Sequence, residues 1–280
     1  MTLPTLASEI MFYVGTFPVT NTYINSTITV LLFGIFGFFL NLSMKKYYSK
    51  ESAPKGLLNF FEAVLETIMG YFDQVTGNRE KTIKFLPIVG SLFFFILVSN
   101  WMAFLPGTGS IGLWQFHNGQ MQIVPLLRPA NTDLNTTAAM AVLAVTSSHI
   151  LGIAIIGFFK YINKFIKLGD LYIAVKSLNP VKILVVVIEF FVGFIEIFSE
   201  IAKMVSLSLR LYGNIFAGEI LLTVIASLIA GYGAFAIPLP FMALELIVGV
   251  IQATVFAMLT LVYLNIATQE PLNHAEEAAH

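Results

Sequence analysis

An all-α, polytopic membrane protein is the fold class that the sequence predicts, as a single membrane domain over residues 1–280. Of these residues, 57% are hydrophobic and only 11% are charged, and the mean hydropathy is +0.84. Such values lie far outside the range of soluble globular domains. Several apolar runs also approach the roughly 20 residues that a helix needs to cross a ~30 Å hydrocarbon core. A membrane barrel would instead show short segments of alternating polarity.

Five apolar segments are candidate membrane helices, and one further segment is amphipathic. The five cover residues 24–44, 85–105, 134–158, 183–230 and 241–268. Segment 56–76 carries Glu62, Glu66 and Asp73 within a largely apolar sequence. This pattern predicts a helix that lies on the membrane surface and does not cross the membrane.

The segment 183–230 is too long for one perpendicular crossing. Its 48 residues would extend about 72 Å at 1.5 Å per residue, more than twice the ~30 Å core. No proline interrupts the chain between Pro180 and Pro238. A long, strongly inclined helix, bent near one of its glycines, therefore explains the segment better than a sharp hairpin. The candidate bends are at Gly193, Gly213 and Gly218.

The basic residues sort by side if segment 56–76 does not cross. Two groups lie in connections on the same side, namely Lys45, Lys46, Lys50, Lys55, Arg79, Lys81 and Lys84, and then Lys160, Lys164, Lys167, Lys176 and Lys182. Arg128 alone lies in the opposite connection, residues 106–133. The positive-inside rule then places the N-terminus outside and the C-terminus in the cytoplasm. Trp101 and Trp114 lie near the ends of the outer connection, as interfacial anchors do.

Composition and motifs argue against several other functions. The net charge of -1 suggests no nucleic-acid partner. The chain has no cysteine, which excludes disulfides, iron–sulfur clusters and thiol chemistry. The histidines show no metal-ligand spacing: His117, His149, His274 and His280. There is also no Gly-rich P-loop with Lys and Ser/Thr, and no zinc-binding HExxH motif. We therefore expect no cofactor, no metal and no catalytic activity of the chain alone.

The long segment carries several ionisable residues, which are costly if they meet lipid. Glu189, Glu196, Lys203 and Arg210 follow one another at seven-residue intervals and so share one helical face. Glu200 lies three residues before Lys203 and can neutralise it locally. For the first four charges of the segment, a paired or snorkelling group at the cytoplasmic end of the helix and a transport role are both open: Glu189, Glu196, Glu200 and Lys203.

Arg210 differs from its neighbours because no acid lies one turn away. The residues three and four positions from it are Ser206, Leu207, Gly213 and Asn214. A guanidinium keeps its charge, so a carboxylate is expected from another helix or another chain. Its flank is small, which allows a neighbouring helix to approach closely. The alternative is a permanent pair with Glu245 within this chain.

The last segment adds Glu245 and Gln252, seven residues apart on one face of an otherwise almost wholly apolar helix. Glu219 lies about two and a half turns beyond Arg210. Carboxyl groups in such surroundings can exchange protons near neutral pH, which suits a relay. The alternatives are an interfacial carboxylate for Glu245, an amide that bridges helices for Gln252, and a paired packing residue for Glu219.

Four stretches carry a resemblance to a known family. SLSLRLYGNIFAGEILL at 206–222 resembles the hallmark segment of subunit a of the rotary, F-type ATP synthases. RPANTDLNTT at 128–137, LNPVK at 178–182 and the final helix with Glu245 and Gln252 are also similar to that family. Together these stretches extend over most of residues 85–268.

The resemblance implies roles for particular residues. Arg210 would be the essential stator arginine, with Asn214 and Gln252 as its polar neighbours. Glu219 and Glu245 would line two aqueous half-channels. Many members of the family have a histidine at one of these two positions, so the division of labour between the two acids stays open.

A further polar group precedes the third apolar segment. Asp133, with Asn131 and Asn135, resembles the family's polar group near the outer entrance. The alternative for Asp133 is an acid at a helix N-terminus, favoured by the helix dipole.

The resemblance also implies partners and a location. The chain would couple proton or sodium flow to rotation of a c-ring, beside b-type peripheral stalk subunits, the rest of the ATP synthase and membrane lipid. It would lie in a bacterial plasma membrane, and ATP chemistry would belong to the partner subunits. The rival classes are a secondary transporter, which usually shows repeats and broken helices, and an intramembrane enzyme, which needs a nucleophile with its base. The sequence shows neither feature.

Overall fold

The computed structural model describes residues 8–48, 56–102, 112–117, 120–126, 128–166, 180–228 and 237–269. Several residues used in the sequence arguments lie outside this description: Lys50, Lys55, Lys167, Lys176, Asn179, His274, His280, the side chain of Trp114, and residues 103–105 and 229–230 at the ends of two candidate helices.

The described structure is mainly helical. The elements are α1 (Asn21–Tyr48), α2 (Leu57–Thr76), α3 (Arg79–Trp101), the short 3₁₀ helix η2 (Ala130–Thr132), α4 (Leu134–Ile156), α5 (Phe158–Ile166), α7 (Pro180–Leu228) and α9 (Pro238–Ala267). Long, apolar stretches that could cross a membrane occur in α1, α3, α4 and α9. The predicted class, an all-α polytopic membrane protein, is therefore confirmed.

Two β-hairpins, which the sequence analysis did not anticipate, accompany the helices. Strand β1 (Ile10–Val14) pairs antiparallel with β2 (Phe17–Thr20), and β3 (Gly112–His117) pairs antiparallel with β4 (Gln120–Pro125). The first turn contains Gly15 at φ 64°, a conformation that glycine adopts without steric cost. Both hairpins are two-stranded, so they leave the helical class unchanged.

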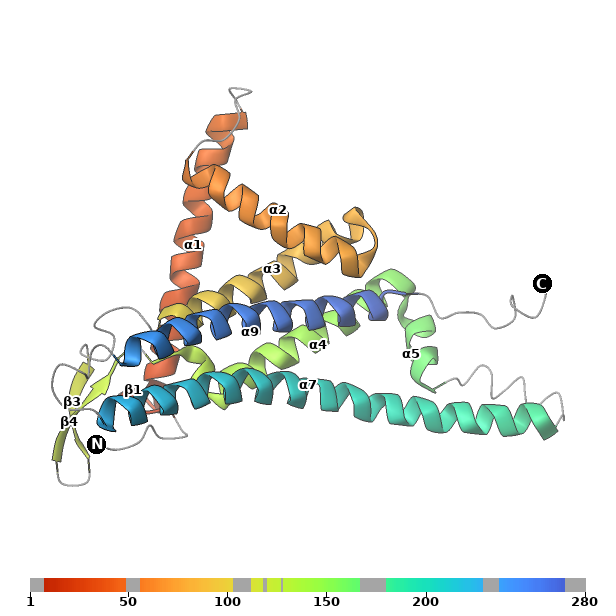
Figure 1. Ribbon diagram of the computed structural model, residues 1–280. Helices are drawn as coiled ribbons and strands as arrows, with labels where there is room; N and C mark the ends of the chain where they lie inside the picture. The colour runs from red at the N-terminus through yellow and green to blue at the C-terminus, as the bar shows by residue number, and fades with distance from the viewer. Residues whose placement is uncertain are drawn as a thin grey trace.

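Figure 1 shows α4, α7 and α9 running lengthwise beside one another, with α1 standing at a steep angle to them. Helix α9 packs against α3, α4, α7 and α2, and α4 packs against α7. The hydrophobic core lies between these helices. Its fully buried members include Phe85, Val89 and Ile96 of α3, Ala141 and Ala144 of α4, Leu207 and Leu211 of α7, and Phe256, Ala257 and Leu261 of α9. The alanines let helix backbones approach closely, as in other membrane bundles.

Helix α7 is the longest element and holds most of the candidate site. It is continuous through Gly193, Gly213 and Gly218, so none of these glycines interrupts it. In Figure 1 it extends well beyond α4 at its N-terminal end. Its length is about 74 Å for 49 residues. The C-terminal half of α7 packs against α4 and α9.

The amphipathic segment forms α2, which is linked to α3 by a tight connection. Gly77 closes α2 in the left-handed conformation, with φ 65°, and Asn78 then caps α3 by accepting a hydrogen bond from the Glu80 backbone N–H at 2.8 Å. Asn is a favoured residue at this position because its side chain satisfies a free helix N–H. The connection fixes α2 against the end of α3.

Candidate functional site

The Arg210 side chain on α7 is exposed. Within the described part of the chain it has no hydrogen-bond or ion-pair partner. The alternative of a permanent Arg210–Glu245 pair is therefore not realised in this structure. Because a guanidinium stays charged, a counter-charge for Arg210 has to come from outside the described residues.

The surface around Arg210 is made of small residues. Ser206, Gly213, Asn214 and Ala217 are all exposed on the same side of α7. No heavy atom lies within 4 Å of the position that a Cβ at Gly213 would take. A helix from another chain can therefore approach the guanidinium closely.

Asn214 and Gln252 join α7 to α9. The Asn214 Nδ2 atom donates a hydrogen bond to Gln252 Oε1 at 2.7 Å. Gln252 is 4% exposed, so this amide bridges two helices from a buried position. Asn214 lies one turn after Arg210, and the bridge therefore sets the distance between α9 and the arginine-bearing face of α7.

Glu245 of α9 also lies at the interface with α7. Its side chain is 5% exposed, and its Oε1 atom is buried without a hydrogen-bond partner among the described residues. The carboxyl group occupies the space beside Gly218 of α7, where any side chain would collide with it. Gly218 therefore makes room for a buried carboxyl group between two apolar helices.

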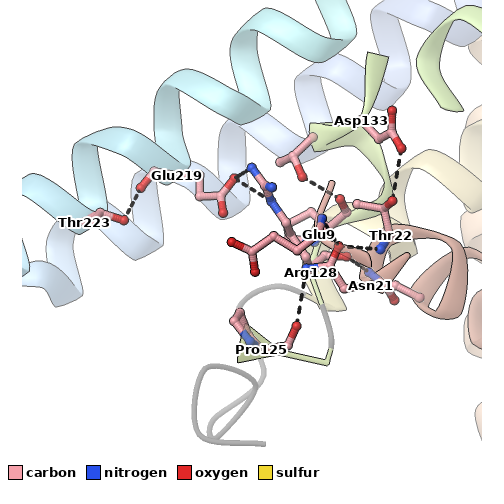
Figure 2. Close-up of polar contacts among 11 residues, drawn as sticks. Glu9, Asn21, Thr22, Pro125, Arg128, Asp133, Glu219 and Thr223 are labelled. Carbon is pink, nitrogen blue, oxygen red and sulfur yellow. Dashed lines mark hydrogen bonds and ion pairs between the residues drawn. The ribbon is translucent and has the colours of Figure 1, made fainter. Parts of the chain in front are cut away.

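Glu219, the next residue on α7, has a different environment (Figure 2). Its Oε2 atom accepts hydrogen bonds from Arg128 Nη2 at 3.1 Å and from Arg128 Nε at 3.3 Å. Arg128 is 4% exposed, so the pair is shielded from solvent on the arginine side. The alternative that Glu219 is a paired residue matches this geometry. From the sequence, Arg128 was expected only to lie in the outer connection, residues 106–133.

Asp133 and Asn131 belong to a polar cluster where α1, η2 and α4 meet. Asp133 caps α4 by accepting the Asn135 backbone N–H at 2.9 Å, and it also accepts a hydrogen bond from the Thr22 hydroxyl at 3.1 Å (Figure 2). Asn131 is fully buried and donates to Asn100 Oδ1 at 2.5 Å. The helix-capping alternative for Asp133 is thus present in the structure.

The charges near the other end of the bundle pair locally. Lys203 donates to Glu200 Oε1 at 2.7 Å, as their three-residue spacing predicted. Glu200 Oε2 also lies 3.6 Å from His149 Nε2, and His149 Nδ1 lies 2.7 Å from the Tyr161 hydroxyl oxygen. Burial, followed by the negative charges of Glu200 and Glu196, raises the pKa of the Tyr161 phenol to about 12. Of the alternatives for this face, local pairing is realised at Glu200 and Lys203.

Sequence reasoning missed Arg128 as part of the site. Its partner Glu219 is 91 residues away, so no helical spacing could join them. The available signal was that Arg128 is the one basic residue in the outer connection, next to long helices that contain uncompensated acids. For the residues that the structure describes, no group of three or more His, Cys, Asp or Glu side chains could hold a metal.

The fold and these polar contacts define a class: a multi-pass helical membrane protein with ionisable side chains held between apolar helices. The family model for the ATP synthase A chain matches residues 24–265. The chain belongs to this family, the subunit a of F-type ATP synthases, which is an ion-translocating part of that complex.

Bacterial relatives extend over most of the chain. Subunit a of the ATP synthase of Moorella thermoacetica is 30% identical over 254 residues, which cover 91% of this chain and 93% of that protein. The subunit of Mycobacterium ulcerans is 32% identical over 255 residues, with 91% and 89% covered. A subunit a of Propionigenium modestum described as sodium ion specific is 33% identical over 261 residues, with 92% and 77% covered.

Proposed function

We propose that this chain is the stator subunit a in the membrane sector of an F-type ATP synthase and that Arg210 couples cation flow to rotation of a c-ring. The observation that carries the proposal is the exposed guanidinium of Arg210, which has no partner among the described residues and is flanked by small side chains. An unpaired, permanently charged group on an apolar helix is costly in lipid unless a partner chain supplies a carboxylate.

The mechanism uses two offset aqueous half-channels, each of which reaches the middle of the membrane from one side. A rotor carboxyl group is neutral while it faces lipid. As it approaches Arg210, the fixed positive charge favours its ionised form, so its cation leaves into one half-channel. After rotation, the carboxylate takes up another cation from the second half-channel. Arg210 thereby separates the two half-channels and prevents a cation from passing directly between them.

The other polar residues border this path. Asn214 and Gln252 hold α9 beside the arginine-bearing face, and Glu245 and Glu219 line the half-channels. Asp133 and Asn131 lie in the polar cluster that would border the outer entrance. Support comes from the placement of Asn214, Gln252 and Glu245 at one interface between α7 and α9.

The energy for rotation comes from the cation gradient. Each elementary charge that crosses the membrane yields about 2.3 kcal/mol per 100 mV, so several cations are needed for each ATP made. The sequence contains no P-loop, and the chain is therefore a transport subunit, not a catalyst by itself. ATP chemistry belongs to partner subunits, and b-type peripheral stalk subunits would hold this chain against the turning ring.

The proposed orientation follows the basic residues. Five crossings in a bacterial plasma membrane, with α2 on the surface, place the N-terminus outside and the C-terminus in the cytoplasm. The transported cation is a proton or sodium. A relative from Propionigenium modestum is described as sodium ion specific, so transport should be measured with and without sodium.

The experiment that tests this function replaces Arg210 by Ala in the assembled complex. We expect ATP synthesis and ATP-driven pumping to be abolished and a passive cation leak to remain, because rotor sites could then exchange between half-channels without a full turn. Arg210→Lys should also be severely impaired, since an ammonium group can lose its proton and lacks the planar fork of guanidinium.

The assay uses reconstituted vesicles with the complex checked for complete assembly. Synthesis is measured under an imposed gradient, and passive conductance is measured without nucleotide. Arg79→Ala is the matched control, because Arg79 pairs with Asp73 away from the proposed site. Wild-type synthesis by assembled Arg210→Ala would refute the function proposed for Arg210.

A further inference from the structure

Two carboxyl groups of the proposed ion path lie close together in the bundle but differ in their partners. Glu219 bonds the guanidinium of Arg128 through two nitrogen atoms, at 3.1 and 3.3 Å (Figure 2). Glu245 has no hydrogen bond or ion pair within the described part of the chain. Glu219 belongs to α7, and the Glu245 carboxyl group lies beside Gly218, the preceding residue of the same helix.

The Arg128–Glu219 pair resists a change of charge. Arg128 is 4% exposed, so loss of the negative charge on Glu219 would leave a buried guanidinium without this counter-ion. Removal of one member of a buried pair is far more costly than removal of both. The two hydrogen bonds that Arg128 donates to Glu219 Oε2 stabilise the ionised form of this carboxyl group.

Glu245 is free of this constraint. Its carboxyl group is 5% exposed and lies in the gap left by Gly218, and its Oε1 atom has no partner. A buried polar atom without a partner is an unfavourable state that water or a cation would relieve. Uptake or release of a cation at Glu245 breaks no ion pair among the described residues.

We infer that Arg128 and Glu219 form a fixed ion pair that does not exchange the transported cation, and that Glu245 is the carboxyl group that takes up and releases it. Arg128 is then a positioning residue, which holds the Glu219 carboxylate between the outer polar cluster and α7. This inference rests on the proposed function, because it divides the two acids of the same path. The outer part of the path then contains one fixed ion pair, Arg128–Glu219, and one exchanging group, the Glu245 carboxyl group.

The exchange step at Glu245 is simple for either cation. With protons, an O–H bond forms at a Glu245 carboxyl oxygen while one O–H bond of hydronium breaks and leaves water, and the reverse step returns the proton to water. With sodium, the Glu245 carboxylate is an oxygen ligand and no covalent bond changes. Measurement of pumping against pH, with and without sodium, distinguishes the two cations.

The test compares four variants of the assembled complex in vesicles: Arg128→Met, Glu219→Gln, the two together, and Glu245→Gln. We expect each change at the pair to lower ATP-driven pumping by about tenfold or more, and the double variant to recover to within about threefold of wild type. Glu245→Gln should lose about a hundredfold or more, because it removes the exchanging group. The double variant Asp73→Asn/Arg79→Gln, which deletes a more exposed ion pair, is the control and should pump normally.

The pH profile separates exchange from a structural role. The double variant should keep the wild-type pH midpoint of pumping. Glu245→Asp should shift the midpoint, whereas Glu219→Asp, which keeps the charge beside Arg128, should not. These conservative variants decide the question if the double variant does not assemble.

Several outcomes would overturn the inference. One is a double variant that assembles but pumps no better than Glu219→Gln, and another is a midpoint that moves with Glu219→Asp and not with Glu245→Asp. Both results leave the proposed function intact if Arg210→Ala still abolishes coupling. Normal pumping by Glu219→Gln and Glu245→Gln alike would instead remove both acids from the ion path, and this inference would fall with them.

Discussion

The carboxyl group of Glu245 on α9 occupies the place beside Gly218 of α7 where a Cβ atom would otherwise lie. Gln252 follows Glu245 by seven residues along α9, and Asn214 precedes Gly218 by four residues along α7. The two helices make a second contact there, a hydrogen bond of 2.7 Å from Asn214 Nδ2 to Gln252 Oε1. The helices are thus antiparallel at this interface, with matched polar contacts on one face of each. This arrangement holds a buried carboxyl group about two turns from Arg210.

Replacement of Gly218 by Ala should displace the Glu245 carboxyl group and leave the helix packing largely intact. The added methyl group meets the end of a flexible side chain, which can move to a less favourable rotamer at a cost of about 1 kcal/mol. We expect normal assembly and ATP-driven pumping lowered by about fivefold, which is the factor that about 1 kcal/mol represents. Gly213→Ala is the matched control, since nothing lies within 4 Å of its added methyl group. Equal pumping by both variants would contradict this prediction.

The Asn214–Gln252 hydrogen bond should contribute measurably to the contact between α7 and α9. Asn214→Leu removes the donor and leaves the buried carbonyl of Gln252 unpaired. Interhelical hydrogen bonds in membranes are worth roughly 0.6 to 2 kcal/mol, so we expect a loss of about 1 kcal/mol of folding free energy. The measurement is a double-mutant cycle with Gln252→Leu, read by unfolding in mixed micelles. Strictly additive losses would show that the bond does not couple the helices.

Tyr161 should make the stability of the protein fall at high pH. Burial, followed by the charges of Glu200 and Glu196, raises its pKa to about 12, above the ordinary value of 10.0. The folded state therefore holds the phenol proton more tightly than the unfolded state. This contribution is fully present below about pH 10 and is lost as the pH rises from about 10 to about 12.

The measurement is the unfolding free energy of wild type and Tyr161→Phe between these two pH values. Ionisation of the phenol is followed in parallel by difference absorbance between the two proteins. Tyr161→Phe should lose less stability than wild type across this interval. Identical pH dependence of the two proteins would exclude the raised pKa.

The proposed topology predicts which introduced cysteines react from each side. The natural chain has no cysteine, so single replacements give a clean background. Lys50→Cys and Lys164→Cys should react with reagents that reach the cytoplasm, and Asn118→Cys should react with reagents applied outside, because the basic residues gather on one side. Impermeant maleimides on intact cells and on inverted vesicles provide the measurement. Labelling of positions 50 and 164 from opposite faces would overturn the five-span topology.

The sequence by itself determined the features that depend on local spacing. Helices follow from runs of apolar residues, and one helical turn brings residues three or four apart into contact. The Glu200–Lys203 pair and the absence of an acid one turn from Arg210 could therefore be read directly, and the structure shows the pair at 2.7 Å. The motif around Arg210 also indicated the family, which the family model then matched over residues 24–265.

Only the tertiary structure decided which distant side chains meet. Asn214 and Gln252 are 38 residues apart, Arg128 and Glu219 are 91 apart, and Thr22 and Asp133 are 111 apart. Sequence spacing fixes which face of a helix a residue occupies, but the packing angle and axial position of each helix decide what that face contacts. In a membrane this choice depends on close contacts of small residues such as Gly218, because apolar side chains pack against lipid about as well as against one another. Glu219 and Glu245 could therefore be recognised as candidates from the sequence. Arg128, the partner that distinguishes them, is identified only by the tertiary structure, in which the segment just before α4 packs against α7.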